Sequence, residues 1–121
     1  MQTATGGFAG SKAPFMLQPL LRERLGAPCD TGRTKAELAR CFPQICEWEG
    51  FGEMEEVWWA TATEYDLLER VDRVKRWITS RPEQVIAVVG HGGLFTRILG
   101  YHLKNCGFQW VQWGSAPSDL I

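Results

Sequence analysis

The 121-residue sequence has no apolar stretch long enough to cross a bilayer, which takes about 20 apolar residues in a helix. Residues 1–10 lack the basic start and apolar segment of a secretory signal peptide. Because 13 basic residues stand against 14 acidic ones, the formal net charge is −1, without the basic excess that nucleic-acid binding requires. We therefore expect a cytoplasmic protein with neither a membrane nor a nucleic-acid partner.

Residues that commonly hold metals and nucleotides are also scarce. The sequence has two histidines, and its cysteines form no close-spaced pairs of the zinc-binding type. It contains neither a phosphate-binding P-loop nor a Gly-x-Gly-x-x-Gly motif. We therefore expect no metal and no cofactor, and reduced thiols, as is usual in the cytosol. The cysteines are Cys29, Cys41, Cys46 and Cys106.

Hydrophobic residues make up 45% of the chain, which is enough for the core of one small domain. Six tryptophans are many for this length, so we expect several to anchor a core or to line a pocket. The length and composition predict a single domain over residues 1–121, with a frayed tail at 114–121.

The most informative stretch is residues 84–100. Residues 85–89 form an unbroken apolar run rich in β-branched side chains, which predicts a strand buried on both faces of a sheet covered by helices. After Gly90, residues 94–103 have the apolar period of a helix, and so do residues 64–80 before the run. A helix, a buried strand and a second helix in this order predict an α/β protein.

Weaker signals mark the other elements. Residues 15–21 predict a short strand interrupted by Pro19, and the alternation over 108–113 predicts a last, half-exposed strand. Thr34 and Glu37 match a capping box for a helix over 35–41. In the helix over 64–80, one apolar stripe is expected, with the basic residues largely outside it. The stripe comprises Leu67, Leu68, Val71, Val74 and Ile78, and the basic residues are Arg70, Arg73 and Lys75.

His91 lies between the end of the predicted strand and the start of the next helix. Ligands of α/β sheets collect at that edge, and helix N-termini attract anions such as phosphate. A lone histidine is often structural, but the neighbouring glycines leave this imidazole uncrowded and favour a binding role. His102 lies inside an apolar helix without glycine neighbours, so we expect it to be a packing or surface residue.

Glu23 is the second candidate, in the triplet Arg22-Glu23-Arg24. Such a triplet is most often a solvated surface. Because it directly follows a predicted strand, Glu23 could instead point to the same sheet edge as His91. A carboxyl group among cations, close to a phosphate, can act as a general acid.

The sequence His-Gly-Gly also occurs in the oxyanion loop of lipase-like α/β-hydrolases. That interpretation requires a nucleophile in a Gly-x-Ser-x-Gly motif. No such motif is present in the 121 residues, so we reject it.

Three stretches resemble the histidine phosphatase superfamily, in its phosphoglycerate-mutase-like branch. Residues 86–93, Ile-Ala-Val-Val-Gly-His-Gly-Gly, resemble its second-histidine motif. Residues 20–30 resemble the segment that supplies its proton-donor glutamate, and residues 64–77 resemble the helix before the second-histidine strand. The resemblance implies a three-layer α/β fold with a mostly parallel sheet flanked by helices, and a small phosphorylated substrate.

In this family, a histidine in an Arg-His-Gly triplet attacks phosphorus and becomes a phosphohistidine. A second histidine and two arginines bind the phosphoryl oxygens, and a glutamate protonates the leaving oxygen. The resemblance implies that His91 is the second histidine and Glu23 the donor, with Gly92, Arg22 and Arg33 contacting the substrate. The physics agrees, because phosphoryl transfer depends mainly on a preorganised cationic site.

The sequence departs from the family in one large respect, since it contains no Arg-His-Gly triplet. Residues 1–4 resemble the end of a family stretch whose arginine binds phosphate. We therefore expect an incomplete domain missing its first strand, a truncated and inactive product whose nucleophile lies outside this chain. A pseudophosphatase that binds a phosphorylated ligand or partner without cleaving it is the alternative. A third possibility is a small α/β domain whose Gly-His-Gly-Gly is only a turn. The sequence specifies neither the substrate within the phosphorylated class nor the oligomeric state.

Overall fold

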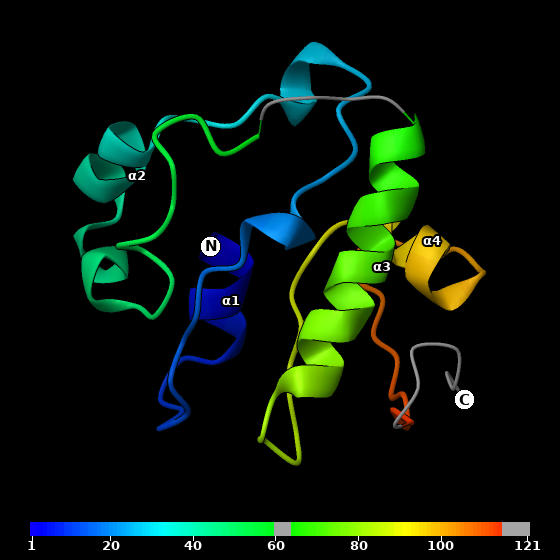
Figure 1. Cartoon of the computed structure of the whole chain (residues 1–121). Helices are drawn as coiled ribbons and strands as arrows, with labels where there is room; N and C mark the ends of the chain where they lie inside the picture. The colour runs from blue at the N-terminus through cyan, green and yellow to red at the C-terminus, as the bar shows by residue number, and fades with distance from the viewer. Residues whose placement is uncertain (60–63, 115–121) are drawn as a thin grey trace. The chain divides into compact units, whose positions relative to one another are not determined.

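The computed structural model describes residues 1–59 and 64–114, and their contacts form two compact units (Figure 1). The first unit comprises Met1–Pro19 and Thr31–Ala60, and the second comprises Leu20–Asp30 and Thr61–Ile121. Most of the tail predicted to fray, residues 115–121, lies outside the described residues.

Helices account for the regular structure. They are α1 (Gln2–Gly7), α2 (Lys35–Cys41), α3 (Glu64–Ser80) and α4 (Gly92–Leu99), with 3₁₀ turns η1 (Pro19–Leu21), η2 (Pro28–Asp30) and η3 (Pro43–Glu47). The predictions for α2 and α3 are confirmed at both ends. The prediction for α4, residues 94–103, began two residues late and extended too far, because Gly100 adopts a left-handed conformation with φ 83° and ends the helix. Within the described ranges, no helix is long and apolar enough to span a bilayer.

The predicted three-layer α/β fold is wrong, because residues 1–59 and 64–114 form no β-strand. The run over residues 85–89 has no regular secondary structure, and Val85 is 74% exposed. Residues 15–21 contribute an isolated parallel bridge from Met16 to Glu49 and then the 3₁₀ turn η1. Residues 108–113 form no strand either. A β-branched apolar run has the local preference of a strand, but a strand forms only where a neighbour takes up its backbone hydrogen bonds.

In the first unit, α2 begins at a complete capping box. Thr34 Oγ1 accepts a hydrogen bond from the Glu37 N–H at 3.2 Å, and Glu37 Oε2 accepts one from the Thr34 N–H at 2.9 Å. Both bonds satisfy N–H groups that the first turn of a helix leaves without intrahelical partners. The helix then packs on η3. The buried residues of this α2–η3 core are Leu38, Ile45 and Met54.

We expect Thr34→Ala to destabilise α2 by about 1 kcal/mol, the usual cost of losing a side-chain N-cap.

Hydrogen bonds from the backbone and hydroxyl of Thr34 lower the pKa of Glu37 below 4.5. The stabilisation by ionised Glu37 is therefore present above pH 4.5 and is lost as the pH falls through that lowered pKa. Amide hydrogen exchange along α2, measured across this pH range, tests both effects. Thr3→Ala, at an exposed position of α1, is the control and should change stability by less than about 0.5 kcal/mol.

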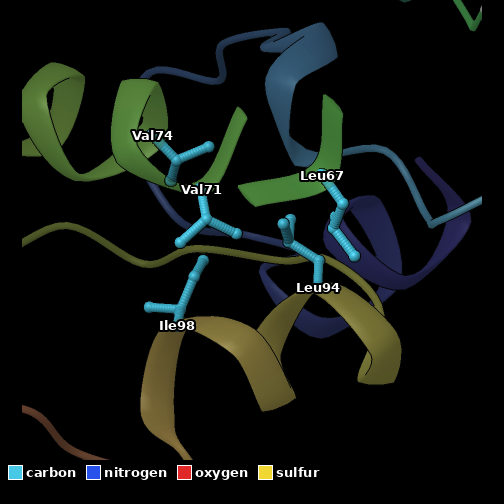
Figure 2. Close-up of a cluster of buried hydrophobic side chains, with 5 residues drawn as sticks. All are labelled: Leu67, Val71, Val74, Leu94 and Ile98. Carbon is cyan, nitrogen blue, oxygen red and sulfur yellow. The ribbon is translucent and has the colours of Figure 1, made fainter. Parts of the chain in front are cut away.

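In the second unit, α3 packs on α4 through one apolar core (Figure 2). The residues of this α3–α4 core are Leu67, Val71, Val74, Leu94 and Ile98. The predicted stripe on α3 is confirmed at three of these positions, and Ile78 packs against the core from its edge. Leu68 was wrongly included, since it is 54% exposed.

Arg70 was wrongly placed outside the stripe, because it is only 8% exposed. It lies three residues after Leu67 and four before Val74, so the helical period turns it toward the same side of α3.

Candidate functional site

His91 is the N-cap residue of α4, with an extended backbone at φ −128° and ψ 152°. Its ring is exposed and makes no capping hydrogen bond. The prediction that His91 lies at a sheet edge is wrong, because the described residues contain no sheet. The prediction that a helix follows His91 is confirmed, although α4 begins at Gly92 and not at Leu94, and His91 therefore lies at the positively polarised end of α4.

Glu23 contacts the first turn of the same helix, although it lies 70 residues before Gly93 in the sequence. Its Oε2 accepts a hydrogen bond from the Gly93 N–H at 3.3 Å. Its Oε1 accepts one from the N–H of Arg24 at 2.8 Å. The carboxylate of Glu23 therefore contacts Gly93, which follows His91 by two positions in the sequence.

Gly93 is required for this contact. A Cβ atom at position 93 would lie 2.5 Å from Glu23 Oε1, a separation that real Cβ atoms essentially never show. At Gly92, a Cβ atom would meet only the Cε1 of His102, at an ordinary 3.5 Å. The two neighbouring glycines therefore differ, since only Gly93 needs to lack a side chain to leave room for Glu23.

Arg70 of α3 contacts the backbone of residues 20–23, the segment that ends at Glu23. Its guanidinium donates hydrogen bonds to the carbonyl oxygens of Leu20 at 3.2 Å, of Glu23 at 3.4 Å, and of Arg22. Burial is the main cause that lowers the pKa of Arg70 to about 10; the positive charge of Arg22 lowers it further, and Glu23 partly opposes the shift. The sequence did not identify Arg70 as a functional residue, although its spacing from Leu67 indicated that it lies on the buried side of α3.

A solvent-open pocket of about 540 Å³ adjoins Gly93. It is lined by Arg24, Leu67, Leu68, Gly93, Thr96, Arg97 and Gly100. This volume lies within the range of small-molecule sites, and the lining combines cationic with apolar groups. Such a lining suits an organic anion rather than a purely apolar ligand.

The other predicted site residues are divided between the units. Arg22 lies in the second unit with Glu23 and Gly92, and its carbonyl is held by Arg70. Arg33 lies in the first unit, where its Nη1 is 3.6 Å from the sulfur of Cys41. Its carbonyl oxygen accepts a hydrogen bond from the indole N–H of Trp58 at 2.8 Å, so Arg33 belongs to the surroundings of the tryptophans.

His102 is exposed, as expected of a surface residue. Its Nδ1 lies 3.5 Å from the hydroxyl oxygen of Thr96, which in turn donates to the Gly92 carbonyl at 2.7 Å. Among the described residues, no group of three or more His, Cys, Asp or Glu side chains could hold a metal ion.

Comparison with known proteins gives matches to one family. The sequence model described as histidine phosphatase superfamily (branch 1) matches residues 1–114. A phosphoglycerate mutase-like protein of Arabidopsis thaliana is 32% identical over an alignment of 97 residues, and the alignment covers 77% of this chain. The matched region is 35% of that protein, so the chain spans about a third of its relative's length. No solved structure gives a significant match to the chain.

Proposed function

Because the chain belongs to the histidine phosphatase superfamily, we propose that it carries the phosphoryl-binding histidine and the proton-donating glutamate of a phosphomonoesterase or phosphomutase. His91 is the proposed phosphoryl ligand and Glu23 the proposed donor. The observation that supports this most strongly is the hydrogen bond from the Gly93 N–H to Glu23 Oε2 at 3.3 Å. It holds a carboxyl group at the helix end that also presents His91.

The proposed chemistry follows from the charges at this helix end. A phosphoryl group accepts hydrogen bonds from a ring N–H of His91 and from the N-terminal N–H groups of α4. Glu23 is proposed to act as the general acid, in its protonated form, next to the bound phosphoryl group. Glu23 then donates its proton to the leaving oxygen as the oxygen–phosphorus bond breaks. The attacking histidine is proposed to lie outside these 121 residues, since the sequence has no Arg-His-Gly triplet.

The pocket beside Gly93 is the proposed place for the rest of a small phosphorylated substrate. Arg24 and Arg97 give this pocket positive charge, and Leu67 and Leu68 give it apolar surface. We also propose Gly92 and Arg22 as substrate contacts, because both belong to the second unit, with His91 and Glu23. Arg33 is retained as a proposed contact on the family resemblance alone.

A pseudophosphatase is the second candidate function. The observation that favours it is the missing Arg-His-Gly triplet, because binding requires His91 but cleavage also requires a nucleophile. Both candidates predict that this chain alone binds a phosphate analogue and does not hydrolyse a phosphomonoester. Turnover of p-nitrophenyl phosphate by the purified chain, abolished by His91→Ala, would contradict the predicted inactivity.

Orthovanadate binding tests the role of His91. We expect His91→Ala to weaken binding about tenfold or more, because a charge-assisted hydrogen bond contributes about 1.5–3 kcal/mol. Chemical-shift changes of the α4 amides on addition of vanadate give the affinity. His102→Ala is the matched control and should bind as the wild-type chain does. Equal affinities of His91→Ala and the wild type would exclude His91 as the phosphoryl ligand.

A further inference from the structure

The buried guanidinium of Arg70 has no role in the proposed chemistry. Among the side chains that the structure describes, Arg70 is the charged one that is buried, at 8% exposure. Burying a cation is costly unless its N–H groups are satisfied. Here they donate to the carbonyls of Leu20, Arg22 and Glu23, all in the segment that carries the proposed proton donor.

We propose that Arg70 is a positioning residue that holds the carboxyl group of Glu23 at the first turn of α4. This inference rests on the proposed function, in which Glu23 donates the proton. Arg70 contacts the backbone carbonyls of Glu23 and of the residue before it, so it restrains the backbone from which the Glu23 side chain extends. The carboxylate is restrained at its other end by the N–H groups of Gly93 and Arg24.

Arginine suits this position because of its geometry. The guanidinium is planar and has five N–H donors in a fixed arrangement, whereas lysine has one ammonium at the end of a flexible chain. A single ammonium cannot reproduce the arrangement that spans the carbonyls from Leu20 to Glu23. Because proton transfer needs a donor within hydrogen-bond reach, a displacement of about 1 Å can cost about 100-fold in rate.

The amide resonance of Gly93 provides the test, since its N–H donates to the Glu23 carboxylate. In the wild-type chain, we expect this resonance to shift with pH as Glu23 titrates, and Glu23→Gln to remove the shift. Arg70→Lys and Arg70→Gln are each expected to lose at least about half of its amplitude, because a displaced carboxylate no longer accepts from Gly93. The matched control is Arg73→Gln, at an exposed position of α3, which should keep the full amplitude.

The amides of Leu94–Ile98 show whether the α3–α4 core remains folded in each variant. Full Gly93 amplitude in a folded Arg70→Lys or Arg70→Gln chain would overturn the inference. No carboxylate titration at Gly93 in the wild type would also overturn it. Loss of folding in both variants would assign Arg70 to core stability instead of positioning. The Gly93 measurement involves no phosphate analogue. If vanadate does not bind although the Gly93 response is intact, only the proposed function is contradicted.

Discussion

Replacing Leu94 with alanine is expected to lower the free energy of unfolding of the second unit by about 3–5 kcal/mol. Leu94 is fully buried and lies where α4 meets α3, close to Leu67 and Val71 (Figure 2). The substitution removes apolar contacts and leaves a cavity that helix packing fills only in part. Native-state hydrogen exchange of the α3 and α4 amides measures the loss, because these amides report the stability of this core.

Leu68→Ala is the matched control for this prediction. Leu68 is also a leucine of the second unit, but it is 54% exposed, so its truncation should cost less than about 1 kcal/mol. If Leu94→Ala and Leu68→Ala destabilise the chain equally, the packing of α3 on α4 described above is wrong.

Replacing Gly93 with alanine is expected to displace the Glu23 carboxylate while the second unit stays folded. A Cβ at this position would lie 2.5 Å from Glu23 Oε1, so the carboxylate must move away. The fold should tolerate the change, because the displaced atoms end a flexible side chain and alanine is favoured over glycine in helices by up to about 1 kcal/mol. We expect the pH-dependent shift of the amide at position 93 to disappear while the thermal midpoint stays within about 3 °C of the wild type.

Gly92→Ala controls for a glycine-to-alanine change in the same turn. A Cβ at position 92 makes only an ordinary contact at 3.5 Å, so Glu23 should stay in place and the shift at Gly93 should persist. An unchanged shift in Gly93→Ala would mean that the carboxylate does not occupy this position. Loss of the shift in both variants would point to the helix backbone rather than to Glu23.

Local signals in the sequence determined α2 and α3 and indicated α4. Thr34 and Glu37 predicted the start of α2, and the apolar period over residues 64–80 predicted α3 at both ends. The apolar period over residues 94–103 predicted α4, although the helix spans Gly92–Leu99. These predictions hold because a helix forms its hydrogen bonds within one segment, and its caps and its buried face are set by residues only a few positions apart.

Part of the candidate site was also predictable. His91 and Glu23 stood out by residue type and neighbours, and the structure places both at the N-terminus of α4. The predicted reason for their meeting, a shared sheet edge, was wrong. The structure instead shows a hydrogen bond from the Gly93 N–H to the Glu23 carboxylate, which depends on the position of Glu23 in space and not on a motif.

Only the tertiary structure decided the remaining features. Residues 85–89 have the composition of a buried strand, yet a strand needs a neighbour that composition cannot supply. The roles of Arg70 and Leu68 were likewise hidden, because both lie close to the stripe of α3 and their burial depends on what packs there. The sequence by itself thus determined α2, α3 and the presence of a helix after His91, and it singled out His91 and Glu23 as the proposed site residues. Strand pairing and the environment of Arg70 depend on contacts between distant segments, so only the folded chain decides them.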